Sequence, residues 1–404
     1  MANIAWLVPS LIEGSGGHRT ILQNASYLEQ FGHSTTLYLE NDSAIRASEN
    51  GADTIRRLFG YEFSDVRVGW NDVQPADLVF ATIWYSAAIV RNLAFPCRRA
   101  YFVQDWEASF NAVGDTYLFA ENSYRYGLVP ITIGNWLARE IEHRFAVTGF
   151  SFDFCADTSI YHPIPNVRRE RAICFICQPE KPRRGARLGI EALGIVKHLM
   201  PDVKIYLYGS SSVPHLWFDA THLGLMNLHE CNALYNRSAV GLCISSTNPS
   251  RIPFEMMAAG LPLVELHREN TLYDLPEGAA LLCDQTAESI AEGLLHLLRN
   301  DSAREIMSAK AVDFMNSRGQ EVGFRQFASA VDWILTNPIG AAPSLRDLTP
   351  MYRTAPVVAS PFASSVPTRS GAPIKFSAPP TPGGMAYRVA KSIYRAINRS
   401  RQSM

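Results

Sequence analysis

Long apolar runs and paired histidine ligands are missing from this sequence of 404 residues, and its one Cys-x-x-Cys, Cys174 and Cys177, lies inside an apolar run that predicts buried thiols. No run reaches the roughly 18 apolar residues that a membrane-spanning helix needs, so we expect any membrane contact to be peripheral. The seven cysteines are odd in number and scattered, and the chain opens with a strand pattern instead of a signal peptide, so we expect a cytoplasmic protein. The ten histidines show no paired metal spacing, and we expect no metal.

A large excess of either charge is also missing. The chain has 37 Lys and Arg against 38 Asp and Glu, a formal net charge of -1, which gives no global reason to expect a nucleic acid partner. Apolar residues make up 47% of the chain, so it can bury a large core. At this length we expect that core to be divided between two globular domains.

Strand and helix patterns alternate along the chain, which predicts parallel sheets covered by helices, an α/β fold. In the first half, strands are expected at 4–9, 35–40, 78–82, 99–103 and 127–133, and helices after 17, at 85–93 and at 136–145, the last capped by Asn135. In the second half, strands are expected at 172–177, 203–209, 239–244, 263–266 and 279–283, and helices at 187–200, 229–236, 255–259 and 287–299.

The domain organisation follows from these patterns. We predict two Rossmann-like domains that face a common cleft, an acceptor domain at 1–165 and a donor domain at 166–322, followed by a closing helix at 323–337. Residues 338–384 are rich in proline, serine and alanine and predict a disordered linker. Residues 385–404 repeat apolar positions every four residues among arginines and lysine, which predicts a basic amphipathic helix on an anionic membrane surface. A solvated tail without a function is the alternative.

The stretch from Leu242 to Leu266 combines a buried strand, a polar loop and the start of a helix. Amides at a helix N-terminus attract anions, so a phosphate at Asn248 to Ile252, a run that includes Ser250 and Arg251, is chemically reasonable. Glu255 follows, and its carboxylate can accept hydrogen bonds from sugar hydroxyls.

Two loops of the first half are further candidates. Gly16 and Gly17 follow the first strand and leave the backbone open to a donor ligand, although glycines after a strand are also ordinary turns. The run Asp105, Trp106 and Glu107 follows the strand at 99–103, at the sheet edge where open α/β sheets bind ligands. It is a candidate acceptor site, with loop hydrogen bonding and packing as the alternative.

A basic loop follows the strand at 172–177. Lys181, Arg183 and Arg184 concentrate positive charge there, which suits a pyrophosphate group. The alternative is that these charges are solvated.

The chain resembles the retaining GT-B-fold glycosyltransferases of family 4, and within them the WsaF-type rhamnosyltransferases. The resemblance extends to about residue 335, and the motifs that carry it are GSGGHRTI from Gly14, FVQDWE from Phe102, YRYG from Tyr124, Asp157 with YHP from Tyr161, PRR from Pro182 with LGIEAL from Leu188, and PFEMMAAGLP from Pro253. It implies a nucleotide-sugar donor, dTDP-L-rhamnose or a UDP-sugar, and a growing cell-surface glycan or lipid-linked glycan as acceptor. It implies retention of configuration and no metal or other cofactor.

The resemblance also assigns roles by position. Glu255 matches the glutamate that holds the donor ribose, Ser250 and Arg251 lie where backbone amides meet the phosphates, and Arg183 matches the basic diphosphate ligand. Thr247 and Gln178 occupy donor-site positions where the family has a glutamate and often an arginine. These two departures leave open an alternative, a non-catalytic sugar-nucleotide or glycan-binding protein of a polysaccharide assembly complex.

The implied reaction is a front-face substitution. The charge of the leaving diphosphate would be stabilised by Arg183, Lys181 or Arg184, and the acceptor hydroxyl would enter from the same side. Domain closure would exclude water, with hinges expected near Pro163 and at 319–324.

Overall fold

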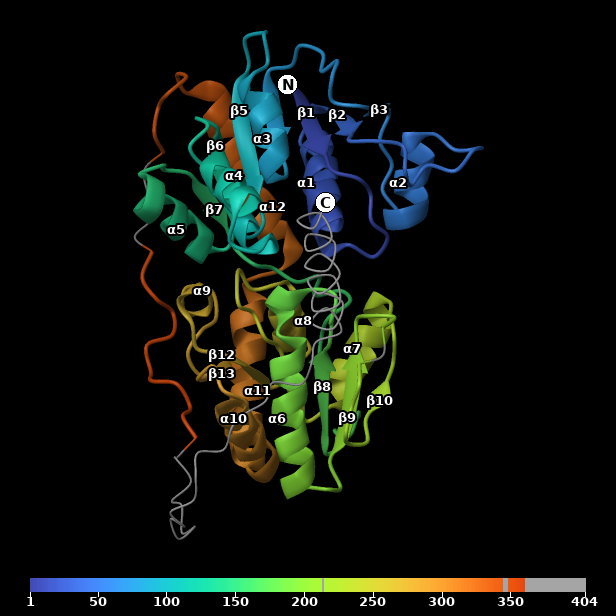
Figure 1. The fold of residues 1–404 in the computed structure, drawn as a ribbon, viewed down its shortest axis with the longest axis vertical. Coiled ribbons are helices and arrows are strands. Elements are labelled where there is room, and N and C mark those ends of the chain that lie inside the picture. The colour runs from blue at the N-terminus through green and yellow to red at the C-terminus, as the bar shows by residue number, and fades with distance from the viewer. Residues whose placement is uncertain (213, 344–347, 360–404) are drawn as a thin grey trace, which may run out of the picture. The chain divides into compact units, whose positions relative to one another are not determined.

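The computed structural model describes residues 1–212, 214–343 and 348–359, and Met1–Ala359 form one compact unit. Two parallel sheets organise this unit, each with helices on both faces (Figure 1). The predicted basic helix at 385–404 and residues 360–384 of the predicted linker lie outside the described residues.

The first sheet has seven strands in the order β3-β2-β1-β4-β5-β6-β7, all parallel. Its strands are β1 (Asn3–Val8), β2 (Ser34–Leu39), β3 (Asp65–Val68), β4 (Leu78–Ala81), β5 (Arg98–Val103), β6 (Val129–Ile133) and β7 (Phe150–Phe152). The helices between them are α1 (Gly16–Gln30), α2 (Gly51–Phe59), α3 (Trp84–Arg91), the 3₁₀ helix η1 (Glu107–Phe110), α4 (Asp115–Ser123) and α5 (Asn135–Phe145).

The second sheet has six strands in the order β10-β9-β8-β11-β12-β13, again all parallel. Its strands are β8 (Ala172–Ile176), β9 (Lys204–Tyr208), β10 (Thr221–His222), β11 (Val240–Leu242), β12 (Leu263–Leu266) and β13 (Ala280–Cys283). Its helices are η2 (Pro182–Arg184), α6 (Ala186–Leu199), α7 (Leu228–Arg237), α8 (Ile252–Ala258), α9 (Glu269–Leu272), α10 (Ala287–Arg299) and α11 (Asp301–Asn316).

Alternating side chains of the strands supply the cores on the two faces of the first sheet. On β5, Phe102 joins the core under α1, whereas Tyr101 and Val103 join the core under α3 and α5. The strands are apolar on both faces because helices cover both.

The chain returns to the first sheet at its end. Helix α12 (Gln320–Thr336) follows α11 but packs against the first sheet, where the buried ring of Phe327 contacts the rings of Trp6, Phe80, Phe102 and Phe152. The predicted closing helix therefore belongs to the core of the first domain.

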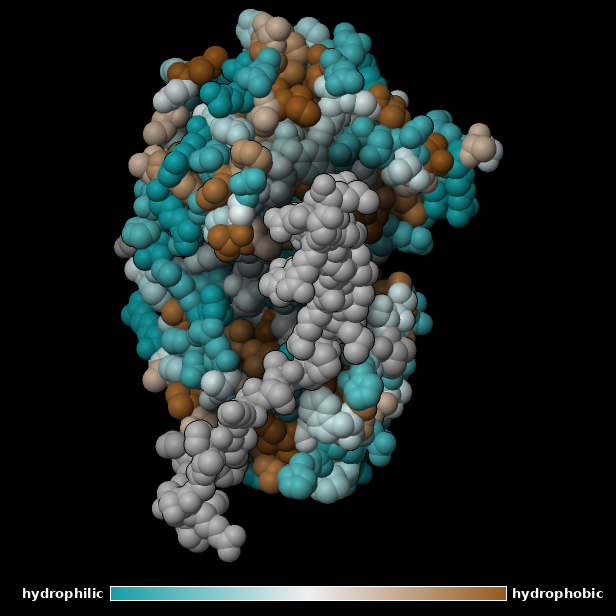
Figure 2. Space-filling view, viewed as in Figure 1, coloured by the Kyte–Doolittle hydropathy of each residue, from teal (hydrophilic) through white to brown (hydrophobic). Residues whose placement is uncertain are grey.

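Residues 348–359 differ from the expected disorder. Tyr352 is buried, Met351 donates its backbone N–H to Leu272 O, and Val357 pairs with Cys283 at the edge of β13. The edge strand β13 and Leu272 provide hydrogen-bond partners for the backbone of residues 348–359. The amino-acid composition of the expected linker does not reveal these partners, and this part of it is ordered. Figure 2 shows hydrophobic residues scattered among hydrophilic ones over the part of this surface that is coloured.

Candidate functional site

The predicted donor and acceptor loops meet where strands of the two sheets end. The backbone N–H of Asn248, after β11, donates to Asp105 Oδ1 at 2.9 Å. The Asn248 side-chain Nδ2 donates to Gln104 O at 3.0 Å and to Ile133 O at 2.9 Å. These loops lie at the carboxyl ends of their strands, the edge where open α/β sheets bind ligands.

The basic loop lies against the donor loop. Gly185, directly after η2, has φ +56°, and a Cβ there would lie 2.3 Å from Ile244 Cγ2. Only glycine tolerates both this conformation and this close approach. Ser246 secures the loop by donating its N–H and its hydroxyl to Arg183 O, so η2 is held beside the residues that follow β11.

Arg183 and Arg184 both face Asp105. The Arg183 Nε donates to Asp105 Oδ2 at 3.2 Å, and an Arg184 nitrogen lies 4.0 Å from the same oxygen. Arg184 is half-buried, with its side chain 13% exposed, and donates to Ser245 Oγ and Asn248 O. Burial lowers the pKa of Arg184 and of Lys181, and the charge of Arg183 lowers both further, whereas the Asp105 carboxylate raises the pKa of Arg184. A bound anion would offset this repulsion, as expected of a phosphate site.

Glu255 is buried on α8 beside arginines. Its carboxylate lies 4.0 Å from Arg251 Nε, and Arg251 Nη1 donates to Gln23 on α1 at 2.6 Å. Burial raises the pKa of Glu255, while Arg251, Tyr161 and Arg19 act in the opposite direction. Arg251 therefore links the first domain to the carboxylate that the sequence assigns to the donor.

The start of α8 is less open to an anion than its sequence suggests. The helix has seven residues, and Ser250 Oγ accepts the N–H of Ile252 at 3.3 Å. One of the first amides is therefore already paired, and the arginines of the neighbouring loop provide the stronger anion site.

Gly16 and Gly17 form the first turn of α1, which is capped by Ser15 through the N–H of His18. A Cβ at Gly17 would lie 3.7 Å from the Gln104 side-chain nitrogen. This glycine turn therefore borders the residue before Asp105, at the same edge of the first sheet.

Trp106 and Glu107 lie in the core of the first domain. Trp106 is 4% exposed, stacks on Tyr124 and lies under the Arg144 guanidinium. The Glu107 carboxylate accepts the N–H of Trp84 at 2.5 Å and the hydroxyl of Tyr101 at 2.8 Å. Burial raises the pKa of Glu107 to about 8. Of the three expected acceptor residues, only Asp105 contacts the opposite domain.

The two positions that depart from the family pattern differ in their surroundings. Gln178 donates its amide to Gly209 O at 2.9 Å. Thr247 is 5% exposed, and its hydroxyl has no hydrogen-bond partner among the described residues. Asn270 donates to the backbone oxygens of Thr247 and Ser245 and so fixes this part of the loop.

Three residues make contacts between the domains that the sequence does not predict. Asn248 bridges three first-domain residues, and Gln23 accepts from Arg251. Asp274 caps α5, where the sequence predicts Asn135 as the cap; the cap position is Gly134, which has no side chain to supply. Only Asn248 carries a local signal, since it lies in the polar loop after a buried strand.

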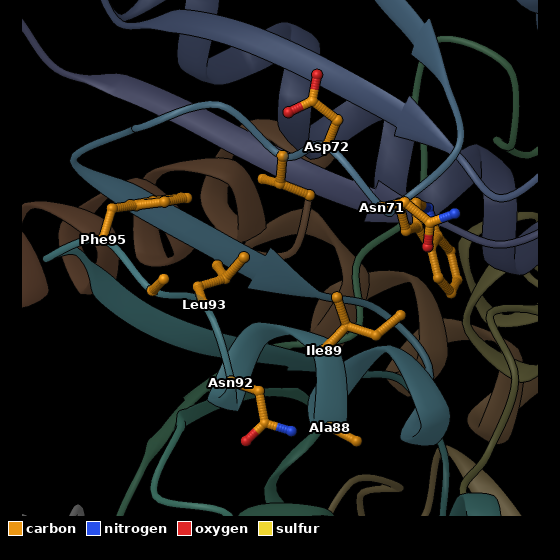
Figure 3. Close-up of a pocket in the computed structure, with 10 residues that line it drawn as sticks. Asn71, Asp72, Ala88, Ile89, Asn92, Leu93 and Phe95 are labelled. Atoms are coloured by element: carbon orange, nitrogen blue, oxygen red, sulfur yellow. The ribbon is translucent and has the colours of Figure 1, made fainter.

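A cavity of about 500 Å³ lies apart from these residues, on the first domain (Figure 3). It is lined by residues 70–73 and by the second half of α3 with the turn after it, including Ile89 and Phe95. None of the predicted site residues lines it. Within the described ranges, no helix is long and apolar enough to cross a membrane, and no three His, Cys, Asp or Glu side chains group as metal ligands.

Comparison with known proteins adds a match in the second domain. Residues 171–295 match the family model of the WsaF C-terminal domain. The O-antigen biosynthesis protein RfbC of Myxococcus xanthus is 30% identical over 244 residues, which cover 59% of this chain and 19% of RfbC. The chain thus spans about a fifth of that relative.

Solved structures extend the likeness to both domains. Sucrose-phosphate synthase from Thermosynechococcus elongatus superposes with a TM-score of 0.62 at 14% identity, covering 83% of this chain and 99% of that one. HepE from Anabaena, in complex with UDP and glucose, superposes with a TM-score of 0.61 at 13% identity, covering 82% and 100%. A glycosyltransferase from Rickettsia africae gives 0.60 at 14% identity, covering 83% and 99%. The chain therefore has the two-domain GT-B fold that its sequence predicts.

Proposed function

We propose that this protein is a glycosyltransferase that moves a sugar from a nucleoside-diphosphate donor to a growing cell-surface glycan. The observation that carries the proposal is the pair Arg183 and Arg184, held where loops of the two domains meet and facing one carboxylate. Two arginines in a partly desolvated site are suited to a diphosphate. The match to the WsaF C-terminal domain includes both arginines and Glu255, which supports this assignment.

The proposed donor is a nucleotide sugar. HepE was solved with UDP and glucose, and an α-glucosyltransferase of the same fold was solved with UDP. The motif resemblance to WsaF-type enzymes favours dTDP-L-rhamnose. Buried Glu255 is the proposed ligand of the ribose hydroxyls. Thr247, whose buried hydroxyl has no partner in the described part of the chain, is a proposed contact of the sugar.

The proposed reaction is a front-face substitution with retention. The bond between the anomeric carbon and the diphosphate oxygen breaks, the oxygen of the acceptor hydroxyl forms its bond from the same face, and the hydroxyl proton passes to the leaving diphosphate oxygen. Arg183, Arg184 and Lys181 stabilise the negative charge that develops on the leaving diphosphate, the main contribution expected of the protein. Arg184 and Lys181 are partly removed from water, which supports this role because charges interact more strongly in a partly desolvated site.

The proposed acceptor is a glycan or a lipid-linked glycan at the cytoplasmic face of the membrane. Support comes from the similarity to a protein named for O-antigen biosynthesis and from the basic, periodically apolar sequence at 385–404. Asp105 is the expected acceptor residue that lies at the junction of the domains.

A second candidate function is a binding protein without transfer activity. Gln178 turns its amide to Gly209 O, and Thr247 brings no carboxylate to the donor site. Calorimetric binding of UDP or dTDP, with no transfer from any nucleotide sugar to a glycan, would favour this second function.

A thermal-shift panel of nucleotide sugars at matched concentrations tests the proposal, since a ligand that binds only the folded state raises the melting temperature. We expect dTDP- or UDP-sugars to stabilise the protein. Glu255→Gln should weaken their binding by roughly tenfold, because the ribose loses a charged acceptor. Glu288→Gln, on the exposed side of α10, is the control and should bind normally. A panel in which no nucleotide raises the melting temperature would overturn the proposal.

A further inference from the structure

The guanidinium of Arg183 is oriented by residues of the other domain. Its Nε donates to Asp105 Oδ2 at 3.2 Å, and its central carbon lies 4.4 Å from the ring centroid of Phe110. Arg183 belongs to η2 of the second domain, whereas Asp105 follows β5 and Phe110 ends η1 in the first domain. The hydrogen bond to Asp105 fixes the Nε edge of the guanidinium, and the contact with the Phe110 ring fixes the plane of the guanidinium.

Asp105 is itself firmly held. Its side chain is 7% exposed, and its Oδ1 accepts the backbone N–H groups of Trp106 and Asn248, both at 2.9 Å. Moving the carboxylate would leave two buried amides unpaired, which is unfavourable. The side chain that orients Arg183 is therefore rigid.

The contact with Asp105 leaves the terminal nitrogens of Arg183 available. A guanidinium has five N–H donors, and its two terminal amino groups form the fork that binds a phosphate bidentately. Within residues 1–359 as described, no hydrogen bond occupies these terminal nitrogens. The Arg183 side chain is 24% exposed, so an anion can reach them. Asp105 thus orients the arginine without covering its phosphate-binding edge.

We infer that Asp105 and Phe110 are positioning residues that hold the Arg183 guanidinium for the diphosphate of the donor. The inference rests on the proposed function and deepens it, because the first domain supplies part of the donor site. The anion site is therefore built from residues of both domains.

Calorimetric titration with UDP and dTDP, and with UMP and dTMP as matched monophosphates, tests this inference. Asp105→Asn and Phe110→Leu should each weaken binding of the diphosphates roughly tenfold, because a charge-assisted contact loses its geometry. Binding of the monophosphates should change less than about twofold. Phe110 is 42% exposed, so its substitution should leave the fold intact. Phe110→Tyr keeps the ring and should restore wild-type affinity.

Combination with Arg183→Ala separates positioning from general damage. In that background, Phe110→Leu should have no further effect on the ratio of diphosphate to monophosphate affinity, because the Phe110 ring contacts the Arg183 guanidinium. Unchanged or tighter diphosphate binding in both single variants would overturn the inference, since Asp105 would then be neutral or a competitor. Equal losses for monophosphates and diphosphates would overturn it as well. If the wild-type protein binds none of the four nucleotides, the proposed function itself fails.

Discussion

Asp274 of the second domain caps the helix that begins at Asn135 in the first domain. Its Oδ1 accepts the N–H of Asn135 at 2.8 Å, and its Oδ2 accepts that of Trp136 at 3.2 Å. The cap position is Gly134, where φ is +84° and a Cβ would lie 2.5 Å from the Phe154 ring. A side chain at the usual cap position is thus excluded, and the other domain provides the acceptor.

Asp274→Ala should lower the free energy of unfolding by about 1–2 kcal/mol, because two buried amides lose their acceptor. Asp274→Asn keeps one side-chain oxygen and should cost less. Urea unfolding followed by circular dichroism measures both. Asp313→Ala, on the exposed face of α11, is the control. If Asp313→Ala lowered the free energy of unfolding as much as Asp274→Ala does, the capping role of Asp274 would be contradicted.

Glu107 should make stability depend on pH. Burial raises its pKa from 4.5 to about 8, so between these values the folded state binds more protons than the unfolded state. Stability then falls as pH rises from about 4.5 to about 8, with about 1.4 kcal/mol for each unit of pKa difference. Glu107→Gln keeps an acceptor for Trp84 and Tyr101 but does not titrate.

The measurement is the urea midpoint of both proteins across this pH range. We expect the wild-type protein to lose stability relative to Glu107→Gln as pH rises. If the urea midpoints of the two proteins changed in parallel with pH, the Glu107 carboxyl would not titrate in this range.

Phe327 should contribute strongly to the first domain, although it lies near the end of the described chain. Its buried ring contacts four aromatic rings of the first sheet, so Phe327→Ala should cost about 3–5 kcal/mol of unfolding free energy. Phe327→Leu fills part of the space and should cost less. Phe119→Ala, at a side chain that is 58% exposed, should change stability little. If Phe327→Ala changed the unfolding free energy as little as Phe119→Ala, the packing of α12 against the first sheet would be contradicted.

Two truncations should separate the ordered segment from the tail. Ending the chain after Ala359 should leave the melting temperature unchanged. Ending it after Pro338 removes buried Tyr352 and the pairing of Val357, and should cost about 1–3 kcal/mol.

Vesicle flotation with the same truncations tests the tail. The full chain should float with vesicles that contain anionic phosphatidylglycerol, and the chain that ends at Ala359 should not, because basic residues are attracted to an anionic surface. Equal flotation of both chains would exclude membrane binding by residues 360–404.

Much of the fold could be predicted because the strands are short, apolar and separated by periodic helices. The expected strand at 99–103 is β5, and the helix expected at 287–299 is α10. The exposed four-residue strand β3 was not predicted, because it carries no apolar run. The placement of α12 on the first sheet was also missed, since periodicity gives a helix but not the sheet it packs against.

The candidate site was predictable only in part. Loops at strand ends identified Arg183, Asp105 and Glu255, which the structure places at or near the junction of the domains. For Trp106 the sequence leaves both an acceptor contact and packing open, and the structure shows packing, since the ring fills the core beside Tyr124. The contact of Asp274 with Asn135 spans 139 positions, and no local pattern indicates a contact at that separation.

Transfer itself is the most direct test of the proposed function. Purified protein is incubated with a panel of dTDP- and UDP-sugars and a glycan acceptor, and nucleotide release is measured together with the mass of the product. We expect release of the nucleoside diphosphate and a mass increase of one sugar residue, with a loss of at least about tenfold in Arg183→Ala. Nucleotide binding without any sugar added to the acceptor would contradict the account.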